Sequence, residues 1–161
     1  MILLILLLMR IRVVWLGKTR DAHLRALIDD YLKRLRHFVH CEITEIRESV
    51  DARTKAGIDK DSKRISDALH SGALTILLDA EGTEFTSRGL AKQVQKWENS
   101  GIKEVEFIIG GPQGVSKEVL DRAHKRWSLS RLTLTHEMTR VLLLEQLYRA
   151  YTIIHGLPYH K

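Results

Sequence analysis

Cysteine and proline are scarce in this chain of 161 residues. Cys41 is the only cysteine, so no disulfide can form within the chain, which favours a reducing compartment. It lies in the strand-like stretch CEITEIR, where a small structural residue is expected. The two prolines, Pro112 and Pro158, both fall where no helix is expected. We therefore predict a cytoplasmic protein that is stabilised by its core and has no disulfide.

No apolar run is long enough to cross a membrane. The run MILLILLL at 1–8 is much shorter than the roughly 20 residues that a transmembrane helix needs. A signal peptide has basic residues before its apolar segment and a cleavage site after it, whereas Arg10 and Arg12 follow this run. Met9 is an alternative start, because MRIRVVWLGKT is typical of a first strand and turn. We expect residues 1–8 to be a start-site extension or an additional strand, and no membrane anchor.

Several common catalytic and nucleotide-binding motifs are missing as well. GGPQG does not match G-x-G-x-x-G, and no G-x-x-x-x-G-K-[ST] occurs, which excludes a dinucleotide fold and a P-loop. His37 and His40 lack neighbouring thiolates or carboxylates, so surface histidines are favoured over a metal site. Neither a nucleophile elbow nor a Cys–His pair with an orienting third group is present.

Apolar strands alternate with amphipathic helices along the chain. Strands are expected at 11–16, 41–46, 73–79 and 105–109, and helices at 21–36, 61–70, 86–99, 116–125 and 137–155. The charged stretch 47–60 has no clear period and is predicted to be a loop, the strand at 73–79 is expected to stop at Ala80, and a short Ser/Thr-rich strand is expected just before the last helix. This order predicts one α/β domain over 1–161, with a mainly parallel sheet and helices on both faces.

The net charge of +6 and the isoelectric point near 9.6 suggest a polyanionic partner, with nucleic acid favoured over a membrane. Basic residues toward the C-terminus are candidates for phosphate contacts, namely Lys117, Lys125, Arg126 and Arg131. The charge alone does not distinguish RNA or DNA binding from an ordinary basic protein.

A ligand site is expected beyond the carboxyl ends of the parallel strands. Three segments should meet there: the end of ALTILLD, the glycine turn in IIGGPQG, and the stretch SLSRLTLTH. Gly110 and Gly111 allow the backbone to approach a ligand closely, although a pair of glycines taken alone is more typical of a tight strand-to-helix turn.

The last helix has an apolar face that could bury against a neighbouring element or a second subunit, formed by Val141, Leu144, Leu147, Tyr148, Tyr151 and Ile154. Glu145 and Arg149 are spaced for an intrahelical ion pair. Arg140 lies in the first turn, where a cation is unfavourable to the helix dipole, which suggests a nearby anion. We therefore hypothesise that Arg140 faces a phosphate or a base.

Three motifs together carry a resemblance to a known family. IIGGPQGV at 108–115, WSLSRLTLTHEMTRVLLLEQLYRAYTI at 127–153 and the terminal PYHK resemble the ribosomal RNA large subunit methyltransferase H family, of the SPOUT class. The resemblance covers 9–161. It implies an α/β trefoil knot, a homodimer, and transfer of a methyl group from S-adenosylmethionine. The implied acceptor is N3 of a pseudouridine in the helix 69 loop of 23S rRNA on the assembled ribosome.

The resemblance also implies site residues, and the lack of further ligands near the histidines already argued against a metal ion. The cofactor would be held by Leu78, Gly110, Gly111, Ser130, Arg131, Leu132, Thr133, Leu134 and Thr135. Thr135 stands where many relatives have proline. The catalytic candidates are His136 and Arg140, with Tyr159 and His160 contributed by the other subunit. The tail is expected to be ordered only across the dimer, and the last helix to supply the dimer surface. A non-catalytic, basic RNA- or ribosome-binding module of the same fold is the alternative, and the intact glycine turn argues against it.

Overall fold

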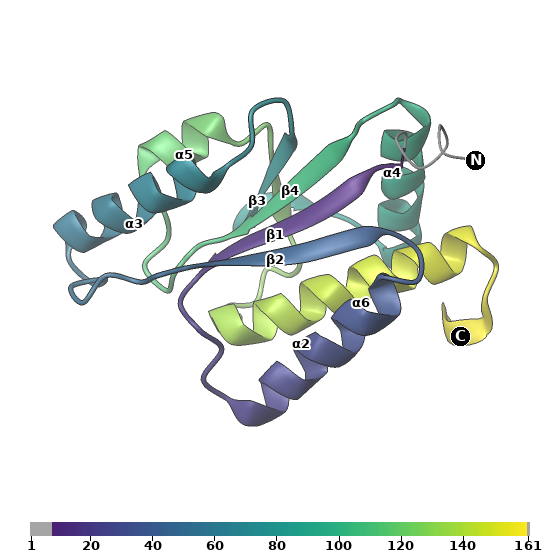
Figure 1. The fold of residues 1–161 in the computed structure, drawn as a ribbon, viewed down its shortest axis with the longest axis horizontal. Helices are drawn as coiled ribbons and strands as arrows, with labels where there is room; N and C mark the ends of the chain where they lie inside the picture. The colour runs from purple at the N-terminus through teal and green to yellow at the C-terminus, as the bar shows by residue number, and fades with distance from the viewer. Residues whose placement is uncertain (1–7, 161) are drawn as a thin grey trace.

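A computed structural model describes residues 8–160, apart from the side chain of His160. Five parallel strands form one sheet in the order β2-β1-β4-β3-β5 (Figure 1). The elements are β1 (Arg10–Leu16), α2 (Ala22–Leu35), β2 (His40–Ile46), α3 (Lys55–Ala68), β3 (Leu74–Glu84), α4 (Ser87–Asn99), β4 (Glu104–Ile109), α5 (Lys117–Arg122), β5 (Lys125–Ser128), α6 (His136–Ile154) and the 3₁₀ turn η1 (Pro158–His160). The predicted α/β class with a parallel sheet is confirmed.

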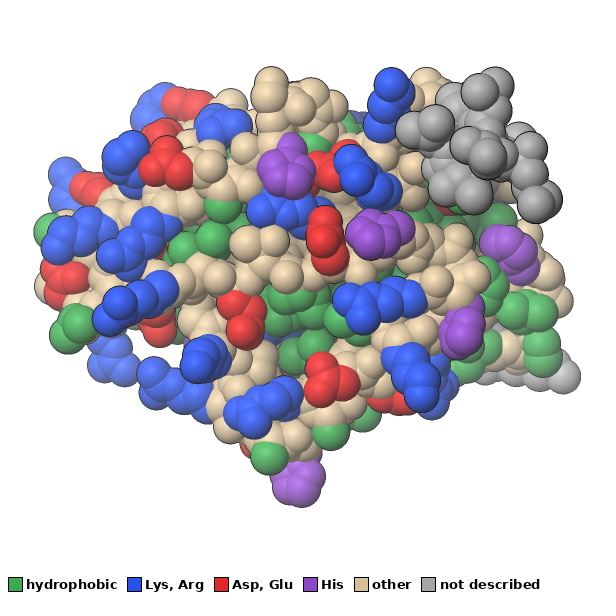
Figure 2. All heavy atoms as spheres, in the orientation of Figure 1, with side chains coloured by type: hydrophobic (Ala, Val, Ile, Leu, Met, Phe, Trp, Pro, Cys, Tyr) green, Lys and Arg blue, Asp and Glu red, His purple; other side chains and the backbone are tan. Residues whose placement is uncertain are grey.

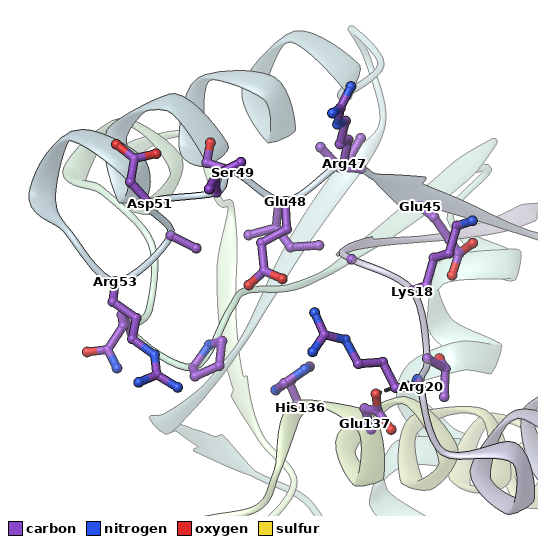
Figure 3. Close-up of a pocket in the computed structure, with 18 of the residues that line it drawn as sticks. Lys18, Arg20, Glu45, Arg47, Glu48, Ser49, Asp51, Arg53, His136 and Glu137 are labelled. Carbon is purple, nitrogen blue, oxygen red and sulfur yellow. Dashed lines mark hydrogen bonds between the residues drawn. The ribbon is translucent and has the colours of Figure 1, made fainter.

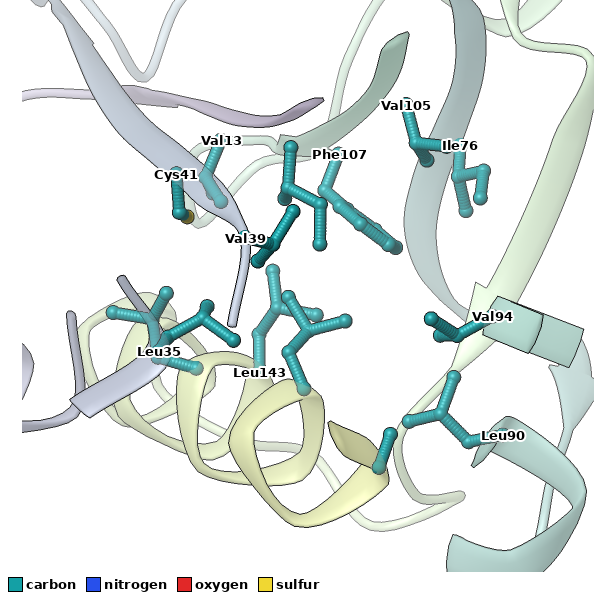
Figure 4. Packing of buried hydrophobic residues seen from close by; sticks show 14 of the residues in the cluster. Val13, Leu35, Val39, Cys41, Ile76, Leu90, Val94, Val105, Phe107 and Leu143 are labelled. Carbon is teal, nitrogen blue, oxygen red and sulfur yellow. The ribbon is translucent and has the colours of Figure 1, made fainter. Parts of the chain in front are cut away.

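Helices cover both faces of the sheet, with α2, α4 and α6 on one face and α3 and α5 on the other (Figure 1). Because successive side chains of a strand point to opposite faces, each buried strand contributes side chains to two hydrophobic clusters. Val13 and Phe107 belong to the larger cluster with Leu143 of α6 (Figure 4). Val14 and Ile108 belong to the smaller cluster beneath α3 and α5. This double covering explains why the strands are apolar throughout.

Several local predictions agree with the structure. Asp21 caps α2, since its carboxylate accepts hydrogen bonds from the N–H groups of His23 and Leu24 at 2.8 and 3.0 Å. Cys41 is fully buried, and burial raises the pKa of its thiol to about 12, as expected for a structural residue. No helix among residues 8–160 has the length and apolar character that a membrane crossing requires. The predicted start-site extension falls mainly on residues 1–7, which lie outside the described residues.

Two boundary predictions were wrong. Helix α3 begins at Lys55, within the predicted loop, because its buried positions include Asp61, Ser62 and Ser66 and so leave no hydrophobic period. Strand β3 continues beyond Ala80 to Glu84 through a register shift against β5. A Cβ on Gly82 would lie 2.6 Å from a backbone carbon of β5, so the close pairing after the shift requires glycine there.

Candidate functional site

A cavity of about 440 Å³ opens beyond the carboxyl ends of β3 and β4, where the parallel sheet places its ligand site. The turn after β4, the irregular segment between β5 and α6, and the first turn of α6 complete its wall. Its lining residues are Leu77, Leu78, Asp79, Ala80, Ile109, Gly110, Gly111, Pro112, Gly114, Val115, Leu120, Arg126, Leu129, Ser130, Leu132, Thr133, Leu134, His136 and Thr139.

Seven of the nine residues that the family resemblance implied for the cofactor line this cavity, namely Leu78, Gly110, Gly111, Ser130, Leu132, Thr133 and Leu134. The other two do not. Arg131 is mostly exposed and lies 3.5 Å from the carboxylate of Glu84. Thr135 is the N-cap of α6, and its hydroxyl accepts the N–H of Met138 at 3.2 Å. Sequence reasoning missed wall residues such as Leu120, which lies in α5 and outside the quoted motifs, and it did not assign Val115, the last residue of IIGGPQGV, to the cofactor.

The two glycines of the turn after β4 have different surroundings. A Cβ on Gly110 would lie 2.8 Å from the side chain of Val115, so packing within the protein restricts that position. A Cβ on Gly111 would meet only Leu16, at 3.5 Å, which is ordinary contact. The described protein atoms therefore leave room at Gly111 for more than a hydrogen, and that room borders the cavity.

The segment between β5 and α6 is irregular, although a Ser/Thr-rich strand was predicted for it. Only Lys125–Ser128 pairs with the sheet, because the chain then leaves the sheet edge to reach the start of α6. The N–H of Leu132 donates to the hydroxyl of Ser130 at 3.0 Å. Within the described chain, the main-chain groups of Thr133 and Leu134 form no hydrogen bond, so they are free to pair with a polar ligand.

Asp79 and Arg126 form an ion pair at the rim of the cavity, with the guanidinium Nε 2.9 Å from the carboxylate. Partial burial raises the pKa of Asp79, but the N–H of Glu81 and the guanidinium of Arg126 both donate to the carboxylate, and together they lower this pKa below its usual value. Arg126 was predicted to contact phosphate. The structure instead assigns its charge to Asp79.

His136 lies on the wall between this cavity and a wider basin of about 1300 Å³. Figure 3 shows its imidazole projecting into that basin from the start of α6. Burial lowers the pKa of His136, and the nearby guanidinium of Arg140 lowers it further. The imidazole is therefore neutral at neutral pH and can accept a proton.

Arg140 is buried, with 1% of its surface exposed, and lines neither cavity. Its guanidinium donates to the carbonyl of Leu16 at 2.5 Å and to the hydroxyl of Thr19 at 2.8 Å, and it lies 4.8 Å from the ring centroid of Trp15. Burial lowers its pKa. The predicted contact with a phosphate or base is therefore wrong for this arrangement. The negative partners that the position of Arg140 near the helix start suggested are two oxygens of the protein itself: the carbonyl of Leu16 at the end of β1 and the hydroxyl of Thr19 in the loop after it.

Tyr159 is held by its own chain, which corrects the expectation that the tail is ordered only across a dimer. Its hydroxyl donates to Glu145 at 3.0 Å, and its ring packs against Tyr148 with centroids 4.8 Å apart. Glu145 lies nine positions along α6 from His136, so the hydroxyl of Tyr159 is held about 14 Å along the helix from the start of α6. The side chain of His160 and all of Lys161 lie outside the described residues.

The apolar face of α6 is also used within the chain. Val141, Leu144, Leu147 and Tyr151 are buried in the larger core cluster, so this face does not supply a dimer surface. The predicted pair of Glu145 and Arg149 is confirmed, with Nε 3.0 Å from the carboxylate.

His37 and His40 are exposed, as predicted. The described residues contain one grouping with metal-ligand side chains, on β4 and after α3. The imidazole of His70 lies 2.6 Å from Glu104 and 3.6 Å from Glu106. The guanidinium of Arg12 also contacts Glu106, at 3.1 Å, so this grouping is an ion network that already includes a cation.

Comparison with known proteins agrees with this geometry. Residues 9–160 match a family model described as "Predicted SPOUT methyltransferase". A ribosomal RNA large subunit methyltransferase H from Desulfotalea psychrophila is 39% identical over 153 residues, covering 95% of this chain and 100% of the relative. The protein of that name from Gloeobacter violaceus is 41% identical over 152 residues, covering 94% and 99%. Among solved structures, a probable methyltransferase from Bordetella pertussis shares the fold, with a TM-score of 0.57 at 12% identity over 88% of this chain and 96% of that one.

Proposed function

The chain belongs to the SPOUT methyltransferase family, among the ribosomal RNA large subunit methyltransferase H proteins, and we propose that it methylates N3 of a pseudouridine in the helix 69 loop of 23S rRNA on the assembled ribosome. One observation carries the proposal. Seven of the nine implied cofactor residues line one cavity, and His136 stands on the wall between that cavity and an open basin. The proposal includes a cytoplasmic homodimer, a single domain over 1–161 and the threaded C-terminal knot of the class.

The cavity fits S-adenosylmethionine as its cofactor. Leu77, Leu78 and Ile109 offer apolar surface for an adenine ring, and the free main-chain groups of Thr133 and Leu134 offer hydrogen bonds that fix its orientation. The room at Gly111 allows a ligand to lie close to the backbone. When bound, the cofactor supplies a methyl group already activated as a sulfonium.

The residues of the chain then need only align the acceptor, exclude water and accept one proton. N3 of the target base carries a proton that must leave before the nitrogen can be methylated. The neutral imidazole of His136 is the proton acceptor that we assign, because it stands on the wall that the base must reach. Arg140 is buried behind the site and acts as a positioning residue, since it lowers the pKa of His136 and holds the end of β1 and the loop after it.

The tail completes the site only if it comes from a second subunit. Within one chain, the hydroxyl of Tyr159 is held at Glu145, about 14 Å along α6 from His136, so the two side chains do not meet. We therefore propose that Tyr159 and His160 reach the site of the partner in the homodimer. This arrangement is isologous, so each subunit would both give and receive a tail.

Methyl transfer from labelled S-adenosylmethionine onto intact ribosomes tests the proposed function, with Gly111→Ala as the informative variant. We expect this variant to fold with an unchanged Tm, since a Cβ there meets only Leu16 at 3.5 Å. Its affinity for the cofactor, measured by calorimetry, should fall about tenfold because the methyl group occupies space next to the ligand. Absence of cofactor binding by the wild-type protein would instead support the non-catalytic RNA-binding module.

The pH dependence of single-turnover methyl transfer tests the role of His136. The rate should rise with pH through the lowered pKa of His136, below the ordinary histidine value of about 6.5, because the neutral imidazole is the active form. His136→Asn should lose this acidic limb and about 100-fold in rate. If the variant kept the same limb, the titrating group would lie elsewhere and His136 would only position RNA.

A further inference from the structure

The wide basin next to the cofactor cavity is the side from which the target base would reach His136, and the groups that would hold the RNA there have not yet been assigned. It lies between the loop after β1 (17–20), the loop between β2 and α3 (47–54), and the start of α6 (Figure 3). Pro112 and His136 line both the basin and the cavity. A molecule in the basin would therefore touch the wall behind which the cofactor binds.

Four basic side chains on the loops of the basin are exposed and form no ion pair within the described part of the chain: Lys18, Arg20, Arg47 and Arg53. Figure 2 shows Lys and Arg side chains gathered at the side of the molecule where α3 faces the starts of α2 and α6. Like charges held near one another repel, and a bound polyanion would relieve that repulsion.

The basic residues that the sequence suggested for phosphate contacts are placed differently. Lys117 lies 2.6 Å from Asp121, and Arg131 lies 3.5 Å from Glu84. Arg126 is paired with Asp79 at the cavity rim, whereas Lys125, at the start of β5, is exposed and forms no ion pair within residues 8–160. The three paired cations are already partly neutralised by the protein itself, whereas the four of the basin are not.

The basin also contains carboxylates, and most of them accept hydrogen bonds from other groups of the protein. Glu137 accepts the N–H groups of Arg20 and Asp21 at 2.6 and 3.2 Å, which fixes the loop after β1. Glu45 accepts the indole N–H of Trp15 at 3.2 Å. Asp51 accepts the hydroxyl of Thr54 at 3.4 Å and lies 4.0 Å from Lys60.

Glu48 is the remaining carboxylate of the basin and has no hydrogen-bond partner within residues 8–160. It faces the side of the basin where His136 and Arg20 project (Figure 3). The basin lining holds five cations (Lys18, Arg20, Arg25, Arg47 and Arg53) and four carboxylates (Glu45, Glu48, Asp51 and Glu137), a net charge of +1, and the four cations on its loops are exposed.

We propose that this basin is the RNA-binding site of the chain, and that Lys18, Arg20, Arg47 and Arg53 contact phosphates of the strand that carries the target nucleotide. The wall at Pro112 and His136 is then the place where the target base meets the cofactor cavity. Guanidinium groups suit this role because they bind phosphate oxygens in a bidentate manner. The inference rests on the proposed function, since that function supplies the RNA.

The buried Arg140 supports the same assignment. Arg140 holds the backbone carbonyl of Leu16 and the side-chain hydroxyl of Thr19, on either side of Lys18, and Glu137 holds the backbone N–H of Arg20. Two of the four cations therefore stand on a loop that is held before any RNA arrives, which reduces the entropy cost of binding.

The double variant Arg20→Ala/Arg53→Ala tests the assignment against Lys63→Ala/Lys96→Ala, which removes the same number of charges from α3 and α4 outside the basin. The basin variant should raise the KM for ribosomes and lower kcat/KM about 10- to 100-fold. The slope of log Kd for ribosomes against log salt should become less steep by about 1.5 to 2. Its Kd for S-adenosylmethionine and its Tm should match the wild type, and the control should match in every measurement.

Ribosome binding is measured separately from turnover, so the two proposals can fail independently. If the basin variant binds and methylates ribosomes as the wild type does, with the same salt slope, the basin is not the RNA site and the proposed function stands. If the wild type binds ribosomes through the basin residues and transfers no methyl group, the RNA site stands and the proposed function fails.

Discussion

The Arg140→Met variant is expected to lose about 3 kcal/mol of unfolding free energy and most of its affinity for ribosomes. Methionine fills a similar volume but donates no hydrogen bond, so the carbonyl of Leu16 and the hydroxyl of Thr19 lose a donor in a buried place. The stacking of the guanidinium over Trp15 is lost as well. Chemical denaturation measures the first effect, and ribosome binding measures the second.

The Arg140→Lys variant, measured in the same way, separates the effect of the positive charge from the effect of the guanidinium geometry. A lysine keeps the cation but presents a single ammonium, which cannot reach two oxygens in the fixed arrangement of a guanidinium. We expect an intermediate loss of stability. Met138→Ala, on the exposed side of the same turn, is the matched control and should change stability little. If Arg140→Met were as stable as the wild type but no longer bound RNA, Arg140 could not have a structural role in the core. The direct contact with phosphate that the sequence suggested would then be the better explanation.

The architecture could be predicted from the sequence because strands and helices leave local, periodic patterns of apolar residues. Apolar runs such as VEFII are typical of strands buried on both faces, and they place a sheet between two layers of helices. The position of the site followed from the same reasoning, since ligands bind at the carboxyl ends of parallel strands. The glycine turn after β4 then had to lie at that edge, and it does.

What the sequence could not predict depends on contacts between distant segments. Arg140 looked misplaced in its helix because the loop that receives its guanidinium lies more than 120 positions earlier in the chain. The start of α3 could not be predicted because its buried face includes polar side chains such as Asp61 and Ser62, so the sequence shows no apolar period there. The cations of the basin come from two separate loops, and loops have no period that could have revealed a common surface.

A variant that lacks residues 159–161 is expected to lose about 100-fold or more in methyl transfer, because the tail would no longer complete the site. Tyr159 also packs on Tyr148 and bonds to Glu145, so the deletion should lower the Tm as well. Tyr159→Phe is the control for that effect, since it keeps the ring and removes only the hydroxyl. A deletion variant with the wild-type rate would remove the tail from the mechanism.

Mixed dimers decide which subunit's tail is used. When the deletion variant is combined in equal amounts with His136→Ala, random pairing makes about half of the dimers mixed. If tails act on the partner, one of the two sites in each mixed dimer has both an intact His136 and an intact tail. About a quarter of the wild-type sites are then restored, although each parent is inactive alone. If tails act within their own chain, no site is complete and the mixture stays inactive.

The structure favours restoration. His136 begins α6, whereas the hydroxyl of Tyr159 is held at Glu145, about 14 Å further along the helix, so it does not reach His136 of its own chain. Glu145 and Tyr148, near the middle of α6, anchor Tyr159 and keep the tail at a fixed point on the surface of its own subunit. A two-fold axis that places this anchored tail beside the start of the other α6 would deliver it to the partner's His136 without unfolding either chain.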